Sequence, residues 1–348
     1  MKYKKIIIST IIILNIAIVI YVRLGNNGFR NLPQDRGSSF IMNTMVQMRV
    51  YGDNASEIIE ESFERIRDIE NKMSVNIEDS YIYQINANAG KPPVTVDDET
   101  FMVIKKAIEY AELSAGKFDP SIGPLVKLWG IGTANARVPA EEEINRAMGK
   151  VNYQWIELDE DTNSVMLRKE GMSIDLGAIA KGYAADVVKN IVEDKHSESA
   201  YIDIGGNIFV IGDKPDGKPW NIGIQDPRKN RGNLMAAIHL SDQTIVTSGN
   251  YERYFVEDEL IYHHIIDPDT GRPARSGMMS TSIITDNSLS ADAFSTIVFM
   301  QSPEKSMELI EKNEGVEAMI IKEDLGIILS TGLKDKIKIL NVDFYIIE

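Results

Sequence analysis

The sequence predicts a mixed α+β fold in which largely antiparallel strands are interleaved with helices. Residues 40–51 alternate apolar and polar side chains, which is typical of a half-buried strand. Residues 56–71 and 100–114 carry apolar side chains at helical spacing. Strands and helices do not alternate regularly along the chain, and no G-x-G-x-x-G follows a predicted strand, so the pattern does not favour a Rossmann fold.

The later elements follow from the same periodicities. Helices are expected over 140–149, 290–300 and 302–313, a hairpin over 155–167, and strands over 220–225, 280–285 and parts of 318–340. A strand over 201–211 is interrupted by Gly205-Gly206, which indicates either a bulge or tight bend, or a close approach of the backbone to a ligand. Thr247-Ser248-Gly249 is expected to be a hydroxyl-rich turn.

Composition excludes several classes of protein. The 348 residues allow one large domain or two modest ones. The net charge of -15 argues against nucleic acid as a partner, because phosphate backbones are bound by an excess of Lys and Arg. The chain has no cysteine, which excludes disulfides, thiolate metal sites and a cysteine nucleophile. The chain has only four histidines, so few zinc ligands are available and a zinc site is not favoured.

The N-terminal segment has the features of a membrane anchor. Three lysines precede an aliphatic run from Ile6 to Val22, which is near the lower limit for a membrane span. Because no small-x-small cleavage site follows, a retained signal anchor is favoured over a cleaved signal peptide. We therefore expect a transmembrane helix within residues 1–23, a linker over 24–39, and one domain over 40–348 on the outer side of the cell membrane.

The segment from Ser173 to Asp186 combines several features of an anion-binding corner. It is predicted to pass from a strand end into a helix, with Asp175 as the N-cap. Gly177 permits a close backbone approach, and Lys181 lies within one or two helical turns of Asp175. Helix N-termini favour negative charge, so the corner suits phosphate. The alternative interpretation is a capped helix with one solvated lysine.

Three other segments allow both a structural and a functional interpretation. Phe118-Asp119 lies in a loop rich in glycine and proline, which is either a packed connector or part of a pocket wall. His263 and His264 are adjacent on a predicted strand, so only one of them can face a given pocket. Asp292 and Thr296 are four residues apart on a predicted helix, and they either cap a turn or supply two oxygens to Mg²⁺.

Six segments, in their order and spacing, resemble the ApbE family of FAD:protein FMN transferases. The resemblance covers nearly all of the chain from about Met42 onward. The segments are Gly116-Lys117-Phe118-Asp119, residues 175–183 (D-L-G-A-I-A-K-G-Y), Ile204-Gly205-Gly206-Asn207, residues 247–251 (T-S-G-N-Y), residues 264–271 (H-I-I-D-P-D-T-G), and Ala291-Asp292 with Ser295-Thr296.

The resemblance implies an extracytoplasmic, Mg²⁺-dependent transferase. Such an enzyme splits FAD, attaches the FMN half through a phosphoester bond to a Thr or Ser hydroxyl of a target flavoprotein, and releases AMP. Some similar proteins hydrolyse FAD to FMN and AMP. The alternatives for this chain are therefore an FAD diphosphatase, or an extracytoplasmic flavin-binding protein without turnover.

The resemblance also implies roles for particular residues. The Mg²⁺ ligands would be Asp292, Thr296 and the backbone carbonyl of Ala178. His264 would be the base that accepts the proton of the target hydroxyl, and His263 would be structural. The residues implied to contact FAD are Met42, Lys117, Phe118, Asp119, Asp175, Lys181 and the backbone of Ile265 or Ile266.

The chain departs from the family pattern at two positions. Met42-Asn43-Thr44 stands where the family has Met-Gly-Thr, and asparagine tolerates the left-handed backbone better than most residues. Val75-Asn76 stands where the family commonly has an aromatic residue that stacks on the cofactor. Either one stacking contact is lost, or Tyr81 or Tyr83 replaces it.

Overall fold

The computed structural model describes residues 32–347 and has a nine-stranded sheet at its centre. The strand order is β1-β2-β6-β7-β10-β15-β16-β17-β19, and neighbouring strands are antiparallel except for β17 and β19. This confirms the predicted mixed α+β fold with largely antiparallel sheets. The strands are β1 (Gln34–Ile41), β2 (Thr44–Tyr51), β6 (Ser199–Ile204), β7 (Asn207–Ile211), β10 (Gln243–Gly249), β15 (Met278–Thr285), β16 (Glu317–Lys322), β17 (Gly326–Leu329) and β19 (Tyr345–Ile346).

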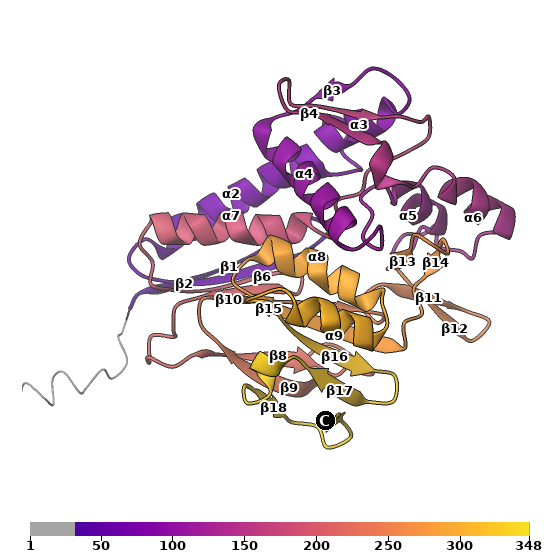
Figure 1. The fold of residues 1–348 in the computed structure, drawn as a ribbon. Coiled ribbons are helices and arrows are strands. Elements are labelled where there is room, and N and C mark those ends of the chain that lie inside the picture. Colours follow the sequence, from indigo (N-terminus) through magenta and orange to yellow (C-terminus); the bar gives the residue numbers. More distant parts are fainter. Residues whose placement is uncertain (1–31, 348) are drawn as a thin grey trace, which may run out of the picture.

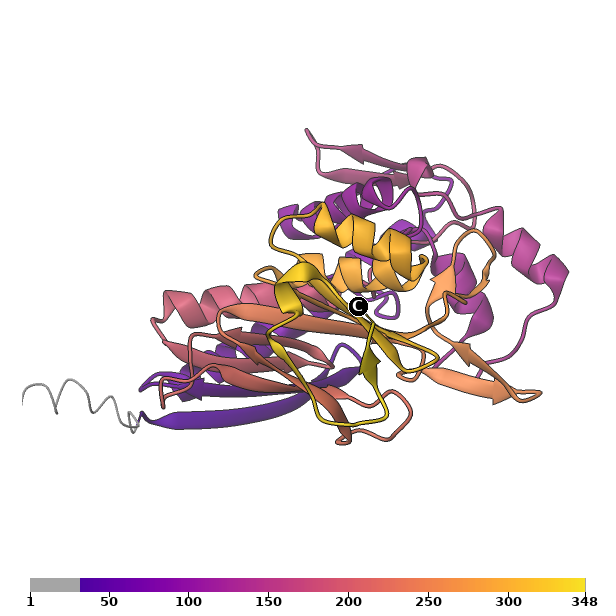
Figure 2. The ribbon, with the colours of Figure 1, turned by 60° about the horizontal axis from the view of Figure 1, so that its bottom comes forward.

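Helices cover one face of this sheet, and a small second sheet covers the other (Figures 1 and 2). The sheet-covering helices are α2 (Ala55–Met73), α7 (Ala180–Asp194), α8 (Ser288–Phe299) and α9 (Pro303–Glu311). The second sheet has the order β18-β9-β8, formed by β8 (Trp220–Gln225), β9 (Leu234–Leu240) and β18 (Ile337–Ile339). Adjacent residues of β10 face different layers: Ile245 packs with the second sheet and Val246 with α8. The period-2 alternation of a strand explains this division.

The remaining elements lie outside these layers (Figure 1). They are α3 (Tyr81–Ala87), α4 (Asp98–Leu113), α5 (Gly123–Trp129), α6 (Glu141–Met148), a sheet of β3 (Val94–Thr95), β5 (Ser164–Leu167) and β4 (Ile156–Asp159), the hairpin of β11 (Tyr254–Glu257) and β12 (Leu260–His263), and the pair β13 (Ile266–Asp267) and β14 (Arg272–Pro273). The predicted hairpin over 155–167 is confirmed by the antiparallel pairing of β4 with β5.

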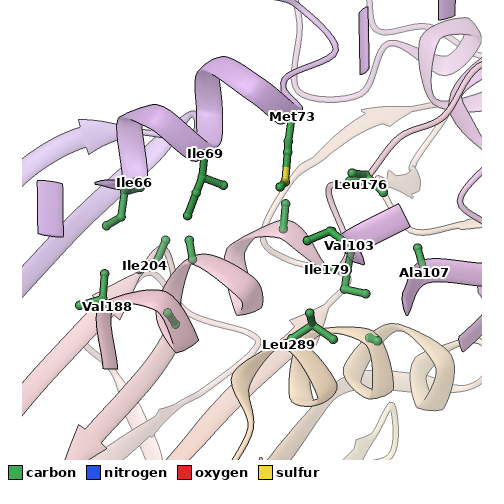
Figure 3. Close-up of a cluster of buried hydrophobic side chains, with 14 of the residues drawn as sticks. Ile66, Ile69, Met73, Val103, Ala107, Leu176, Ile179, Val188, Ile204 and Leu289 are labelled. Carbon is green, nitrogen blue, oxygen red and sulfur yellow. The ribbon is translucent and has the colours of Figure 1, made fainter. Parts of the chain in front are cut away.

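The main hydrophobic core joins α2, α4 and α7 to the central sheet (Figure 3). The amphipathic spacing predicted for α2 and α4 places their apolar residues in this core. The side chains that meet there include Ile66, Ile69 and Met73 of α2, Val103 and Ala107 of α4, Val188 of α7, Ile204 of β6, Leu176 and Ile179 before α7, and Leu289 of α8.

Two hairpins replace predicted single strands. The strand expected over 40–51 is the hairpin β1–β2, whose turn residues Met42 and Asn43 both have φ of 54°. Residues 34–39, expected to be linker, form most of β1. The strand over 201–211 is the hairpin β6–β7, and Gly205 and Gly206 form its turn with φ of 60° and 97°. The glycine pair therefore forms a tight bend, with the positive φ at both positions that a type I′ hairpin turn requires.

Thr247, Ser248 and Gly249 end strand β10 instead of forming the predicted turn. They pair with residues 280–282 of β15. Within residues 32–347, no helix is long and apolar enough to cross a membrane. The predicted transmembrane segment over residues 1–23 lies outside the described part of the chain.

Helices α7 and α8 bind the first-turn N–H groups of one another. Asp186 of α7 accepts hydrogen bonds from the backbone N–H groups of Ser288 (2.7 Å) and Leu289 (2.8 Å). Asp292 of α8 accepts one from the N–H of Gly182 (3.0 Å). These N–H groups have no partner inside their own helix, so the exchange satisfies donors that would otherwise be orphaned. The two helices are thereby fixed in register against each other.

The close crossing of α7 and α8 depends on the missing side chain of Gly182. A Cβ atom there would lie 2.2 Å from the carbonyl oxygen of Ser288 and 2.8 Å from the Cβ of Asp292. We expect Gly182→Ala to lower the free energy of unfolding by roughly 1–3 kcal/mol, because rigid backbone must move to admit the methyl group. Urea unfolding of the full chain measures this change.

Gly149→Ala is the matched control, because its Cβ would meet no atom closer than 3.6 Å. Gly149 has an ordinary helical φ of -62°, so the methyl group introduces no backbone strain. Equal stabilities of the two variants would contradict the close crossing.

Candidate active site

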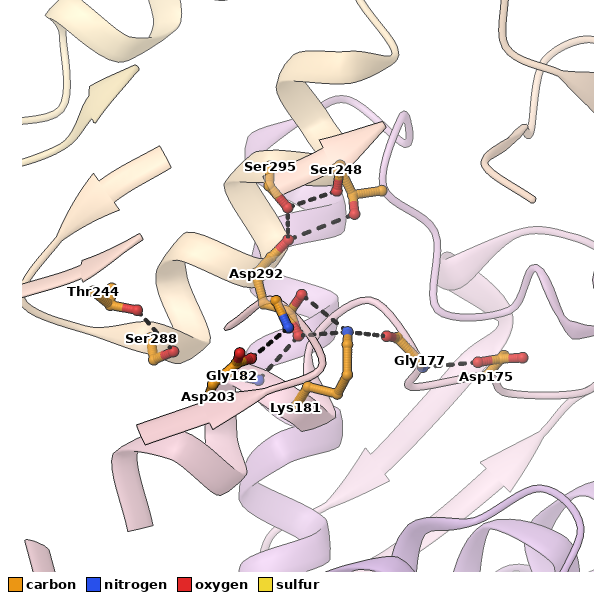
Figure 4. Close-up of polar contacts among 12 residues, drawn as sticks. Asp175, Gly177, Lys181, Gly182, Asp203, Thr244, Ser248, Ser288, Asp292 and Ser295 are labelled. Carbon is orange, nitrogen blue, oxygen red and sulfur yellow. Dashed lines mark hydrogen bonds and ion pairs between the residues drawn. The ribbon is translucent and has the colours of Figure 1, made fainter. Parts of the chain in front are cut away.

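The buried carboxylate of Asp292 lies at the crossing of α7 and α8 (Figure 4). Its side chain is almost inaccessible, and the ammonium nitrogen of Lys181 lies 3.4 Å and 3.5 Å from its two oxygens. Lys181 also donates to the carbonyl oxygen of Gly177 at 3.2 Å. Lys181 and Asp292, which the resemblance implies to be site residues, therefore lie together in the fold, with a lysine beside a buried carboxylate.

Asp175 organises the turn before α7 and does not cap the helix. Helix α7 begins at Ala180 with Ile179 at the N-cap, and no side chain caps it. The Oδ1 atom of Asp175 accepts from the N–H of Gly177 at 2.8 Å. Burial raises the pKa of Asp175, while this N–H, Lys181 and Arg253 act in the opposite direction. The prediction of an N-cap was wrong because the turn from 176 to 179 separates Asp175 from the helix.

The carbonyl oxygen of Ala178 is free to bind a ligand. Ala178 precedes α7, which begins at Ala180 after the N-cap Ile179, so its carbonyl lies outside the hydrogen-bond ladder of the helix. Within residues 32–347 no hydrogen bond to the Ala178 carbonyl is formed. The hydroxyl of Thr296 makes one weak contact, 3.5 Å from the carbonyl oxygen of Asp292.

These oxygens fit a magnesium ion chemically. Asp292, Thr296 and Ala178 offer a carboxylate, a hydroxyl and a carbonyl, and Mg²⁺ takes oxygen ligands while keeping several waters. One protein carboxylate suffices for such a site. No group of three or more His, Asp or Glu side chains is placed to hold a metal anywhere in the described part of the chain. The donor set therefore differs from that of a zinc or calcium cage.

His264 follows β12 with its ring held in one tautomer. Its Nδ1 lies 3.3 Å from the carbonyl oxygen of Arg253, and a carbonyl only accepts, so Nδ1 carries the proton and Nε2 the lone pair. Burial, Arg253 and His263 lower the pKa of His264 to about 3. His263 is buried, with its Nε2 2.8 Å from the carbonyl oxygen of Ala274 and its ring against Phe299. His263 is thus a core residue, as predicted.

Arg253 is a site residue that the sequence analysis missed. Its guanidinium donates to the carbonyl oxygen of Asn43 at 3.2 Å, and its charge affects Asp175 and His264. It therefore joins the β1–β2 turn to the segments around Asp175 and His264. No periodicity marks this residue in the sequence; a lone cation after Glu252 is the only signal.

The 117–119 loop makes mostly internal contacts. Lys117 pairs with Asp267 (3.1 Å) and Asp269 (2.8 Å), and Phe118 is 4% exposed. Both oxygens of Asp119 have internal partners, the N–H and hydroxyl of Ser121 (2.8 and 2.7 Å) and the N–H of Tyr153 (3.1 Å). These contacts fit the packed connector, and the contacts with FAD remain predictions.

The other predicted cofactor contacts lie around the same region. Ile265 and Ile266 are both 6% exposed, and the Ile265 carbonyl accepts from the N–H of Ala274 at 2.9 Å. The N–H of Met42 donates to Glu70 at 2.9 Å. Of the two tyrosines considered for stacking, Tyr81 packs against the main core and Tyr83 is exposed. Contact with the flavin remains a prediction for all of these residues.

Comparison with known proteins agrees with the fold and the site. A model of the ApbE family matches residues 42–320. An FAD:protein FMN transferase of Treponema pallidum is 36% identical over 324 residues, covering 88% of this chain and 90% of the relative. One from Klebsiella pneumoniae is 33% identical, covering 89% and 96%.

Solved structures extend the agreement to three dimensions. The ApbE protein of Thermotoga maritima has a TM-score of 0.81 at 37% identity, covering 87% of this chain and 98% of that one. The flavin transferase ApbE of Vibrio cholerae has a TM-score of 0.79 at 27% identity, covering 88% and 99%. The chain belongs to the ApbE family. The prediction of a transferase is confirmed at the level of this family.

The low pKa of His264 predicts a loss of stability in acid. The unfolded chain binds a proton at His264 below about pH 6.5, whereas the folded chain does not, so stability is lost as the pH falls towards 3. Between pH 7 and pH 5 we expect this residue to contribute a loss of roughly 1–2 kcal/mol. Unfolding of wild type and His264→Gln at both pH values measures it.

Between pH 7 and pH 5, the His264→Gln variant should lose less stability than wild type. It should still lose some stability, because burial also lowers the pKa of His263. His239→Gln, at an exposed position of β9, is the control and should follow wild type. An unchanged pH dependence in His264→Gln would contradict the buried neutral imidazole.

Proposed function

We propose that this protein is a Mg²⁺-dependent FAD:protein FMN transferase. It cleaves the pyrophosphate of FAD, attaches FMN through a phosphoester bond to a Thr or Ser of a target flavoprotein, and releases AMP. Family membership and the names of the relatives support the transfer of FMN from FAD to protein. The observation that carries the metal assignment is the Ala178 carbonyl, which accepts no hydrogen bond within residues 32–347 and lies just before the helix whose Gly182 N–H binds the buried Asp292.

Asp292, Thr296 and the Ala178 carbonyl would hold Mg²⁺ at the crossing of α7 and α8. The ion would supply charge neutralisation for the pyrophosphate. Lys181 adds a second positive charge next to the carboxylate, where it can contact a phosphate oxygen. Phosphoryl-group transfer depends mainly on such positioning and charge stabilisation, so the site needs no covalent intermediate.

The transfer step uses His264 as the base. The oxygen of the target hydroxyl attacks the phosphorus atom of the FMN half, and the bond from that phosphorus to the bridging oxygen breaks. AMP leaves with the bridging oxygen and its electron pair. The Nε2 atom of His264 accepts the hydroxyl proton, because the Arg253 carbonyl keeps the ring proton on Nδ1. The low pKa keeps His264 neutral before the reaction, and it also makes the ring a weaker base than a histidine that titrates near neutral pH.

The function is tested by incubating the full chain with FAD, Mg²⁺ and an acceptor domain that carries an exposed Thr. We expect AMP to form and the mass of FMN to be added to the acceptor. Asp292→Asn should lower AMP release by roughly 100- to 1,000-fold, because the amide can still accept from Gly182 but lacks the charge. Asp286→Asn, the same change at an exposed position before α8, is the control.

Each other outcome contradicts a defined part of the proposal. AMP with free FMN and an unmodified acceptor would indicate an FAD diphosphatase that uses water in place of the hydroxyl. FAD that remains bound and intact in the presence of Mg²⁺ would indicate a flavin-binding protein without turnover. Full AMP release by Asp292→Asn would remove the metal assignment.

We also propose that residues 1–23 hold the protein in the cell membrane with the catalytic domain outside the cytoplasm. The support is the basic flank and the aliphatic run in the sequence. We expect the chain to remain with membranes after a carbonate wash, and protease added to intact spheroplasts to digest the domain. Recovery of the full chain in the wash, or protection from the protease, would contradict the anchor or its orientation.

A further inference from the structure

A set of buried hydroxyl groups joins α8 to the central sheet. Ser295 of α8 lies 2.8 Å from Ser248 of β10, oxygen to oxygen, and Ser288 lies 3.2 Å from Thr244 (Figure 4). Ser295, Ser288 and Thr244 are fully buried. Helix–sheet contacts are usually apolar, and a buried hydroxyl is unfavourable unless it is hydrogen-bonded. The hydroxyl at Ser295 therefore calls for a specific reason.

The directions of the hydrogen bonds at Ser295 can be assigned. Its hydroxyl donates to the carbonyl oxygen of Asp292 at 2.8 Å, which uses its only proton. The hydroxyl of Ser248 must therefore donate to the oxygen of Ser295. Thr281 of β15 donates to the carbonyl oxygen of Ser295 at 2.9 Å. Hydrogen bonds from β10 and β15 thus hold the helical turn that begins at Asp292.

The hydrogen bond from Ser295 to the Asp292 carbonyl affects the hydroxyl of Thr296. In a helix a Thr hydroxyl commonly donates to the carbonyl oxygen four residues before it. That oxygen belongs to Asp292 and is already occupied by Ser295, so Thr296 reaches it only at 3.5 Å. The oxygen of Thr296 is left weakly bound, next to the turn that carries the Asp292 carboxylate.

We infer that Ser248 and Ser295 are positioning residues that hold Asp292 and Thr296 in the arrangement that binds Mg²⁺. Ser295 occupies the Asp292 carbonyl, and Ser248 fixes the rotamer of Ser295 from the sheet. This inference rests on the proposed function, because it concerns the same metal site. Residues that orient metal ligands typically change metal affinity 10- to 100-fold when they are removed.

The test measures Mg²⁺ affinity and not turnover. The thermal unfolding temperature of the full chain in detergent is followed against Mg²⁺ concentration, with FAD present and absent. We expect Ser248→Ala and Ser295→Ala each to raise the Mg²⁺ concentration for half-maximal stabilisation roughly tenfold. Ser248→Thr keeps the hydroxyl and should retain the wild-type value.

Thr247→Val is the matched control. Thr247 and Ser282 of β15 form an equally short hydroxyl pair, 2.7 Å, and alternation along β10 turns Thr247 to the face opposite α8. We expect this variant to bind Mg²⁺ like wild type, although it also loses a hydroxyl–hydroxyl bond. A shift of the same size in Thr247→Val would show a general effect of destabilisation and overturn the inference.

The remaining outcomes are also decisive. If wild type is stabilised by Mg²⁺ and both alanine variants have its half-maximal concentration, the positioning role is wrong, even if their unfolding temperatures without Mg²⁺ are lower. If wild type itself is not stabilised by Mg²⁺ and releases no AMP from FAD, the proposed metal-dependent function fails and the inference fails with it.

Discussion

The structure depends on the exchange of hydrogen bonds between α7 and α8. Each helix uses a carboxylate to bind first-turn N–H groups of the other, through Asp186 in one direction and Asp292 in the other. Gly182 makes the exchange possible, because any side chain there would enter the backbone of α8. The same hydrogen bond ties the buried Asp292 to the first turn of α7, which follows Ala178 in the chain. One packing constraint therefore both stabilises the helix pair and fixes the carboxylate of the site.

The site is assembled from segments that are far apart in the chain. The β1–β2 turn, the loop before α7, the strand ends around Arg253 and His264, and the first turns of α8 meet where the helix layer borders the central sheet. The separate hairpin β11–β12 joins Arg253 to His264, whereas α7 and α8 fix Lys181 and Asp292. Positioning on regular elements suits a reaction that depends on the placement of charge.

The sequence predicted the parts of the site that local spacing encodes. Asp292 and Thr296 could be placed together because helical periodicity puts residues four apart on one face. The left-handed backbone at Asn43 agrees with the tolerance of asparagine, whereas the positive φ of Met42 was not predicted, because it is held by the hairpin and not by the preference of methionine. Thr247 to Gly249 was predicted to be a turn because the segment is rich in hydroxyls, whereas the segment ends β10 and its hydroxyls bind partners on α8 and β15 that tertiary structure supplies.

The order of strands in the central sheet has a consequence for how the chain folds during synthesis. Strand β2 pairs with β6, which follows it by about 150 residues, and all of α2 to α7 lies between them. At ribosomal rates of 5–20 residues per second, the β6 partner of the hairpin β1–β2 is synthesised roughly 7–30 s later. Until then one edge of β2 and its apolar face remain open to pairing with other chains. Helix α2, with its row of isoleucines, follows β2 directly and is available to shield the hairpin during this interval.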